Sequence, residues 1–275
     1  MPRSSSASIA AETRFRSWLL AALCSALLIA IPPRSARGED KPAPTPWCAP
    51  ELEVIQDGVC ALTPPAASKE RTLVIFLHSL VGVGSSWAWE QQRLMAKMAK
   101  TYGLSALIPR GRPGFGPGRD PKVIAWPTAK ELQDQHEPAL LAEWTAAREE
   151  LERRTGKFDK VLVFGFSNGA YYATSLALRG RLDVDGYGVF AGGSGGKYSR
   201  LLAASTERKV PIFVGYGTLD KAHPAQRELA KLLHELRWPH RVKAERIGHT
   251  VSDSQIRGAL QFLGAAAEGA RDSPR

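Results

Sequence analysis

The chain has 275 residues, of which 44% are hydrophobic, and it carries a formal net charge of +10 at pH 7. This length and composition suit one sizeable globular domain and exclude an intrinsically disordered chain. The basic residues are scattered along the sequence and do not form one stripe, so we expect no nucleic-acid partner.

The first 38 residues have the layout of a secretory signal peptide. Arginines precede an apolar run over 18–31, and two prolines and several small residues follow it. We expect cleavage after Gly38, a secreted or periplasmic protein, and no membrane span after cleavage. An uncleaved anchor helix is the alternative, although the run is shorter than the roughly 20 residues that a span needs.

Residues 39–68 form an N-terminal extension that contains Cys48 and Cys60. An even pair of cysteines in an exported chain predicts a disulfide. Asp57-Gly58 between them predicts a tight turn, so we expect a flap stapled by this disulfide. No spacing of cysteine and histidine residues indicates a metal site.

Residues 69–265 alternate between strand and helix patterns, and a flexible tail is expected over 266–275. Several expected strands are near-continuous apolar runs, as strands buried on both faces should be. The alternation predicts a single α/β domain with a doubly wound, mostly parallel sheet, and we expect a monomer. The expected strands cover 72–77, 104–108, 161–164, 186–190, 211–216 and 241–247, and the expected helices cover 90–100, 138–154, 170–177, 224–237 and 252–263.

The pentapeptide Gly-Phe-Ser-Asn-Gly at 165–169 joins the third expected strand directly to an expected helix. A G-x-S-x-G sequence in this context is typical of a nucleophile elbow, a sharp turn that exposes the hydroxyl group of its serine. Side chains two residues to either side would collide with the turn, which accounts for Gly165 and Gly169. We therefore predict that Ser167 is a nucleophile. The alternative is an ordinary Gly-rich turn.

A nucleophilic serine needs a histidine base, and the base needs an acid that orients it. In chains with this elbow, the acid and then the histidine follow the serine. Asp220 follows the fifth expected strand and His249 follows the last one, so both lie at carboxyl ends of strands, where such sites gather. We predict Asp220 as the acid and His249 as the base. His240 precedes a strand and His223 follows Asp220 closely, so both fit the base less well, while a helix cap is the alternative for Asp220.

Two N–H groups should stabilise the negative oxygen that forms during acyl transfer. One expected donor is the backbone of Asn168, the residue after the nucleophile. The other should come from the loop after the first expected strand, where we favour the backbone of Leu80. His78 in the same loop is expected to support the loop and not to take part in the chemistry.

Together these residues resemble the α/β-hydrolase superfamily over nearly the whole domain, from 72 to about 263. Gly-Phe-Ser-Asn-Gly-Ala is similar to the elbow of secreted polyhydroxyalkanoate depolymerase-like and feruloyl-esterase-like enzymes, with His78-Ser79 where those families have His-Gly. The compact size is similar to that of dienelactone hydrolases and small carboxylesterases. The resemblance implies hydrolysis of a small-molecule or polymeric carboxylic ester, without a cofactor.

A long irregular segment over 109–127 is expected on the catalytic side, where such loops often shape a site. Trp87, Phe115, Trp126 and Tyr171 are candidates for the lining of a substrate pocket, and core packing is the alternative for each. The leading functional hypothesis is a serine ester hydrolase. A serine peptidase of the same fold and a non-catalytic binding protein are the alternatives.

Overall fold

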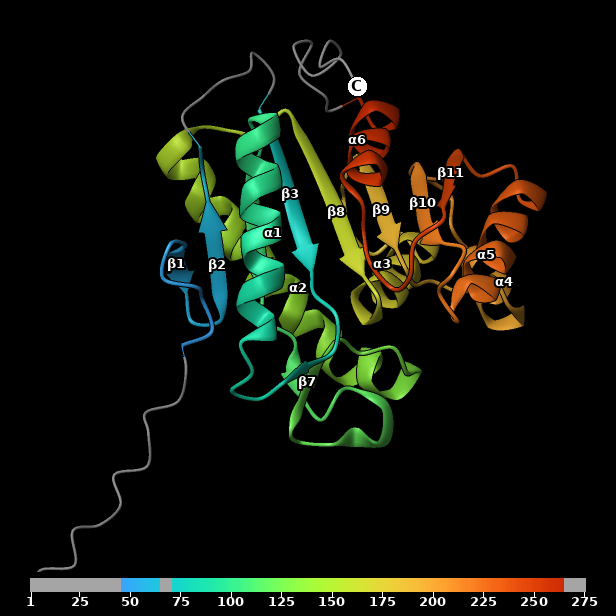
Figure 1. Cartoon of the computed structure of the whole chain (residues 1–275), viewed down its shortest axis with the longest axis horizontal. Coiled ribbons are helices and arrows are strands. Elements are labelled where there is room, and N and C mark those ends of the chain that lie inside the picture. The colour runs from blue at the N-terminus through green and yellow to red at the C-terminus, as the bar shows by residue number, and fades with distance from the viewer. Residues whose placement is uncertain (1–45, 65–70, 265–275) are drawn as a thin grey trace, which may run out of the picture. The chain divides into compact units, whose positions relative to one another are not determined.

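Six parallel strands form the larger part of the main sheet in the computed structural model, which describes residues 46–64 and 71–264 (Figure 1). They are β3 (Thr72–Leu77), β5 (Ser105–Pro109), β8 (Lys160–Phe166), β9 (Gly186–Phe190), β10 (Ile212–Gly217) and β11 (His240–Glu245). Their order across the sheet is β5-β3-β8-β9-β10-β11. The doubly wound, mostly parallel sheet is thus confirmed, whereas the predicted signal peptide, its cleavage after Gly38 and the tail over 266–275 lie outside the described residues.

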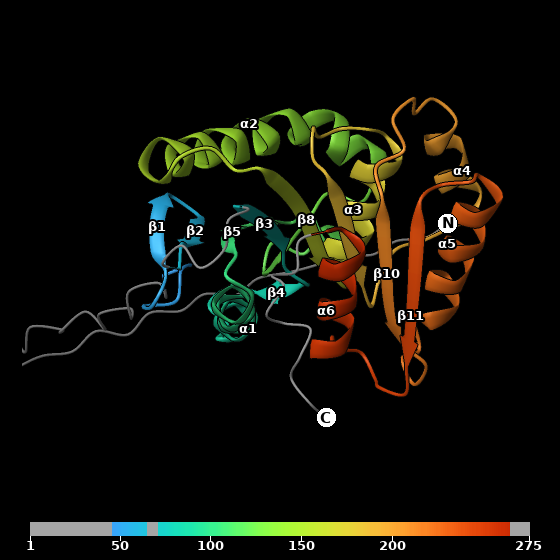
Figure 2. The same ribbon diagram turned by 90° about the horizontal axis from the view of Figure 1, so that it is seen from above.

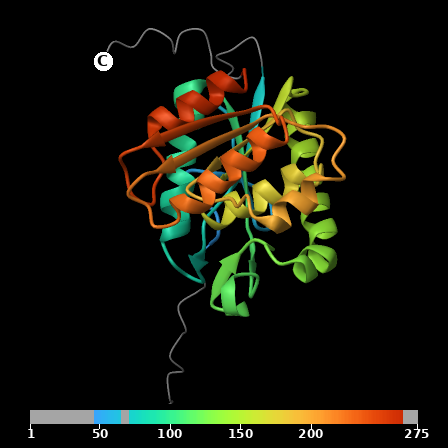
Figure 3. The same ribbon diagram turned by 90° about the vertical axis from the view of Figure 1, so that its right-hand side faces the viewer.

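Helices cover both faces of this sheet (Figures 2 and 3). The described helices are α1 (Trp87–Tyr102), α2 (Lys130–Thr155), α3 (Asn168–Leu178), α4 (Lys197–Ala203), α5 (His223–Glu235) and α6 (Asp253–Phe262). Side chains of β3 alternate between the faces, as the two-residue repeat of a strand requires. Leu73 and Ile75 pack in the core under α2, α3 and α5, while Val74 and Phe76 pack in the core under α1 and α6.

The strands β3 and β8 are neighbours, but the helices that follow them lie on opposite faces of the sheet. The loops after the two strands therefore diverge at the carboxyl ends of the strands. Open α/β sheets bind their ligands at this kind of switch point. Ser167 follows β8 and His78 follows β3, so the fold brings both predicted loops to this switch point.

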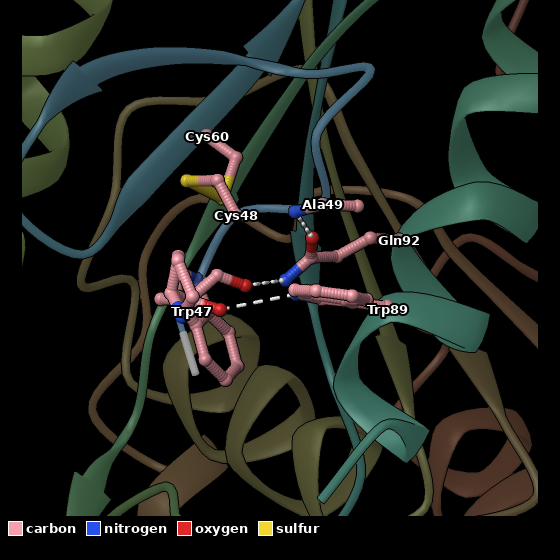
Figure 4. Close-up of a disulfide and its surroundings, with 7 residues drawn as sticks. Trp47, Cys48, Ala49, Cys60, Trp89 and Gln92 are labelled. Atoms are coloured by element: carbon pink, nitrogen blue, oxygen red, sulfur yellow. Dashed lines mark hydrogen bonds between the residues drawn. A yellow bond between two sulfur atoms is a disulfide. The ribbon is translucent and has the colours of Figure 1, made fainter. Parts of the chain in front are cut away.

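The N-terminal flap is part of the main sheet. Strands β1 (Glu53–Gln56) and β2 (Val59–Leu62) form a hairpin around Asp57-Gly58, and β2 pairs antiparallel with β5. The predicted disulfide between Cys48 and Cys60 is present, with its Cα atoms 5.5 Å apart (Figure 4). The flap therefore extends the edge of the sheet, which the sequence analysis did not predict.

Side chains of α1 hold the flap in place (Figure 4). The Gln92 carbonyl oxygen accepts the N–H of Ala49 at 2.8 Å, and its amide nitrogen donates to the carbonyl oxygen of Trp47 at 2.8 Å. The indole N–H of Trp89 donates to the carbonyl oxygen of Pro46 at 3.1 Å. These bonds give the flap a fixed position on the first helix.

Two segments differ from the expected structure. Helix α2 begins at Lys130, so Pro138 lies inside it and not at its start. Segment 109–127 contains β6 (Arg112–Pro113) and β7 (Val123–Ala125), which with β4 (Val81–Gly82) form a small sheet in the order β4-β7-β6. In the described part of the chain, no helix has the length and apolarity needed to cross a bilayer.

Candidate active site

Ser167 lies at the sharp turn between β8 and α3. Its backbone has φ 53° and ψ −115°, a strained conformation for a residue with a side chain, and its N–H donates to the carbonyl oxygen of Phe190 at 2.9 Å. The two glycines of the motif permit this turn. A Cβ atom on Gly169 would lie 2.1 Å from the carbonyl oxygen of Leu77, and one on Gly165 would lie 2.4 Å from that of Gly169. Both contacts are impossibly close, which explains why glycine occupies these positions.

The structure brings Ser167, His249 and Asp220 into one chain of hydrogen bonds. His249 Nε2 lies 2.9 Å from Ser167 Oγ, and His249 Nδ1 lies 2.7 Å from Asp220 Oδ2. A carboxylate can only accept a hydrogen bond, so the proton of a neutral imidazole resides on Nδ1. His249 Nε2 is then the acceptor for the Ser167 hydroxyl proton.

The loops that carry Asp220 and His249 are bound to each other. The N–H of Leu219 donates to the carbonyl oxygen of Ile247 at 3.0 Å. A Cβ atom on Gly217 would lie 2.2 Å from that same oxygen, so only glycine permits this approach. The Asp220 side chain is 4% exposed, and its Oδ1 accepts the N–H of Ala222 at 2.9 Å. The acid is thus buried and fixed, while 47% of the His249 side-chain surface is exposed to solvent.

The loop after β3 is held by side chains from α1. The N–H of Ser79 donates to Gln91 Oε1 at 2.8 Å, and the indole N–H of Trp87 donates to Ser79 Oγ at 3.0 Å. Since the Ser79 N–H is already used, the N–H of Leu80 is the next donor along this loop. The N–H of Asn168 belongs to the first turn of α3, where backbone donors have no partner within the helix.

His78 supports this loop from below. It is fully buried, and burial lowers the pKa of its imidazole to about 4, so the ring is neutral at neutral pH. His78 Nε2 accepts the N–H of Gly111 at 2.9 Å, which puts the proton on Nδ1, 2.5 Å from the carbonyl oxygen of Ser79. Trp47 and Trp126 pack against the ring with centroids 5.0 and 4.8 Å away. His78 therefore links the flap, the segment after β5 and the loop of Leu80.

We expect the His78→Phe variant to lose roughly 10- to 100-fold in kcat, with a smaller change in KM, because a shift of about 1 Å in the predicted oxyanion donor of this loop would have an effect of this size. Steady-state kinetics on a short p-nitrophenyl ester measures it. His234→Phe, at an exposed position of α5, is the matched control and should keep full activity. An unchanged kcat in His78→Phe would show that the loop needs no support from this ring.

The four candidate pocket residues have different surroundings. Trp87 is 42% exposed at the start of α1, and Tyr171 is half-buried in the first turn of α3. Burial and the negative charge of Asp220 raise the pKa of Tyr171, so its phenol stays protonated near the acid. Phe115 packs against His136, with ring centroids 4.6 Å apart. Trp126 has no exposed surface and packs edge-on against Trp144 in the core, so the prediction that it lines a pocket is wrong and the packing alternative is correct.

Sequence analysis missed the residues that position the loop of Leu80. Gln91 and Gln92 are adjacent buried polar residues on α1, and one binds this loop while the other binds the flap. Their only signal in the sequence is two amides inside an otherwise apolar helix face, which does not reveal their partners. Within residues 46–64 and 71–264, no group of His, Cys, Asp or Glu is arranged to hold a metal ion.

Comparison with known proteins assigns the chain to a family. Residues 58–250 match the dienelactone hydrolase family. The chain belongs to this family. A curated relative, acyl-protein thioesterase 1 of Debaryomyces hansenii, is 27% identical over 218 residues, which cover 72% of this chain and 92% of the relative.

Solved structures support the fold of this dienelactone hydrolase family member. Esterase PE8 aligns with a TM-score of 0.55 and 20% identity over 75% of this chain and 97% of its own. The Bacillus cereus carboxylesterase aligns with a TM-score of 0.51 and 16% identity over 75% of this chain and 93% of its own. The chain is therefore a hydrolase with the α/β-hydrolase fold, as the sequence analysis predicted.

Proposed function

We propose that this chain is a secreted serine hydrolase that cleaves carboxylic esters through an acyl-enzyme on Ser167. The observation that carries the proposal is the continuous chain of hydrogen bonds from Ser167 Oγ through His249 to Asp220. A serine activated in this way is a nucleophile toward carbonyl carbon. The strained backbone at Ser167 supports the same role, because strain of this kind gathers at functional sites.

The proposed reaction has two acyl transfers. His249 Nε2 takes the hydroxyl proton while Ser167 Oγ attacks the ester carbonyl, and the same proton then goes to the leaving alcohol. Water enters, gives its proton to His249 and attacks the acyl-enzyme, which releases the acid and restores the serine. Asp220 keeps the imidazole in its required tautomer and stabilises the imidazolium that forms in both steps.

The backbone N–H groups of Leu80 and Asn168 are the proposed oxyanion donors. They come from the loops after β3 and β8, the two neighbouring strands at the switch point. The bond from Ser79 to Gln91 supports the first donor, and the position of Asn168 in the first turn of α3 supports the second. Donors held in advance stabilise the developing charge without any reorganisation of the loop.

Secretion forms part of the proposal. The signal-peptide pattern over 1–38 and the Cys48–Cys60 disulfide both favour an oxidising compartment outside the cytosol.

The relative named as a thioesterase raises thioester hydrolysis as a second candidate, since oxygen esters and thioesters pass through the same acyl-enzyme. Parallel rates on matched acetyl esters and acetyl thioesters distinguish the two substrates.

A fluorophosphonate probe tests the activation of Ser167 independently of the substrate. We expect mass spectrometry of the folded protein to find the phosphonyl group on Ser167. Ser167→Ala should not be labelled, and His249→Ala should react far more slowly because the hydroxyl loses its base. Ser205→Ala, at an exposed position, is the control and should be labelled like wild type. A folded wild-type protein that resists the probe would refute the proposed nucleophile.

A further inference from the structure

A groove of about 230 Å³ lies between α1 and α6 and has the sheet as its floor. We refer to it as the α1–α6 groove. Its floor consists of four phenylalanines at the strands below, Phe76, Phe164, Phe166 and Phe190. One wall follows α1 from Trp87 to Tyr102, and the other follows the chain from His249 to Arg257. Figure 3 shows these two helices on the same face of the sheet.

Apolar side chains from both walls of the groove add to this floor, while other wall residues are polar or charged. Met95 and Met98 from α1 and Ile256 from α6 line it, and Leu94 at its rim is 49% exposed. Methionine side chains are flexible and polarisable, so they adapt to chains of varied shape. Exposed apolar residues that gather along one groove mark a binding surface for apolar ligands. The chemistry of the lining therefore suits an extended hydrocarbon chain.

The groove meets the catalytic residues at one point, His249. His249 and the four residues after it line the groove, and Phe166 lies under the imidazole with ring centroids 5.3 Å apart. Ser167 and the proposed oxyanion donors Leu80 and Asn168 are not among the lining residues. The groove thus opens on the side of the base and not on the side of the oxyanion.

The position of the groove beside His249 distinguishes the alcohol part of an ester from its acyl part. The leaving alcohol receives its proton from His249 Nε2, so its oxygen must lie beside the imidazole when the bond to the acyl carbon breaks. The carbonyl oxygen must lie beside the backbone donors at the same moment. A chain attached to the alcohol oxygen can therefore continue from His249 into the groove.

We propose that the α1–α6 groove binds an apolar hydrocarbon chain on the alcohol side of the substrate. The inference rests on the proposed function, because it uses His249 as the donor to the leaving group. It specifies an ester whose alcohol is long and apolar. From Trp87 to Met98 the wall is about 17 Å long at 1.5 Å per residue, which provides space for a chain of many carbons.

Two series of esters test the assignment. In acetate esters of straight-chain alcohols from ethanol to octanol, kcat/KM should rise about fourfold for each methylene that the groove buries. In ethyl esters of straight-chain acids from acetate to octanoate, kcat/KM should rise much less. A steep rise in the acid series with a flat alcohol series would overturn the proposal.

Substitution at the far end of the groove supplies the second test. Met98→Trp should lower the ratio of octyl acetate to ethyl acetate hydrolysis at least tenfold by filling the space. Ile256→Trp should do the same from the opposite wall, so misfolding of one variant does not end the test. Lys100→Trp, on the exposed side of α1, is the matched control and should keep the wild-type ratio. Unchanged ratios in both folded groove variants would overturn the proposal.

A binding measurement separates this inference from the proposed function. 1-Octanol should bind the Ser167→Ala variant in calorimetry, and adding Met98→Trp should abolish that binding. Should wild type hydrolyse neither series, this octanol binding would still support the groove while the proposed function fails. Absence of octanol binding to folded Ser167→Ala would refute the groove even if short esters are hydrolysed.

Discussion

Replacement of Ser167 by alanine is expected to lower kcat/KM for p-nitrophenyl acetate by about 10,000-fold or more. The variant keeps its proposed oxyanion donors and its histidine, but no acyl-enzyme can form, because the attacking oxygen is absent. Stopped-flow measurement should also show that the initial burst of p-nitrophenol disappears. The loss is expected without any change in the free energy of unfolding beyond about 1 kcal/mol.

Asp220→Asn is the companion variant for the same site. An asparagine retains the shape of the aspartate, but its amide can no longer fix the proton on His249 Nδ1. The imidazole can then carry its proton on Nε2, the nitrogen that must accept the Ser167 proton, so we expect a loss of about 10,000-fold in kcat. Combining it with Ser167→Ala should add little further loss, since the two residues act as one unit. Ser205→Ala is the control and should remain fully active. Retention of a tenth of wild-type activity by Ser167→Ala would rule out the proposed mechanism.

The second large effect concerns stability, at the buried carboxylate of Glu137. It is 1% exposed on α2, and it accepts hydrogen bonds from Arg179 at 2.5 and 2.8 Å, from Arg181 at 2.8 Å and from the Tyr172 hydroxyl at 3.1 Å. Glu137→Leu would leave these donors without their acceptor, and we expect it to lower the free energy of unfolding by about 3–5 kcal/mol. Urea unfolding followed by circular dichroism measures this change.

The contribution of the Glu137 carboxylate to the free energy of unfolding depends on pH. Burial acts to raise the pKa of Glu137, but the hydrogen bonds and charges of Arg179 and Arg181 act against it and leave the pKa below its ordinary value. An unfolded glutamate titrates near pH 4.3, so the stabilisation is complete above about that value and is lost as the pH falls through the lower pKa of the folded state. The stability difference between wild type and Glu137→Leu should therefore shrink in acid.

Two further variants sharpen this test. Glu137→Gln keeps one of the two acceptor oxygens but loses the charge, so its destabilisation should be smaller than that of Glu137→Leu. Glu149→Leu replaces an exposed glutamate on the same helix and should change the free energy of unfolding by no more than about 0.5 kcal/mol. Equal effects of Glu137→Leu and Glu149→Leu would contradict a structural role for the buried network.

Local patterns sufficed to predict the elements around the site. Short strand patterns, several of them apolar runs, predicted the six parallel strands, and the G-x-S-x-G motif located the turn at Ser167. Topology then brought Asp220 and His249 together with it, because carboxyl ends of parallel strands share one edge. The pairing of the flap with the sheet was harder to predict, because a short hairpin in a Pro-rich segment carries no signal for the strand with which it pairs.

Other features depend on tertiary contacts that no single segment encodes. The sequence analysis expected a helix from Pro138, yet α2 begins at Lys130, and Leu132 and Gln133 in the added N-terminal part are buried. Trp126 resembled a pocket residue, but its ring is enclosed by side chains from α2 and α3. The α1–α6 groove arises from the separation of two helices that are far apart in sequence, so composition alone could not reveal it.

Helix α1 has consequences for attempts to redesign this protein. Its Gln91 holds the loop of Leu80, its Gln92 holds the flap, and its Met95 and Met98 line the groove. A library that randomises α1 to alter substrate range would therefore disturb the proposed oxyanion donors together with selectivity, and most of its members should be slow catalysts. Ile256 and Arg257 line the same groove from α6, a different helix from the one that carries Gln91 and Gln92, so we expect substitutions there to change selectivity with less effect on rate.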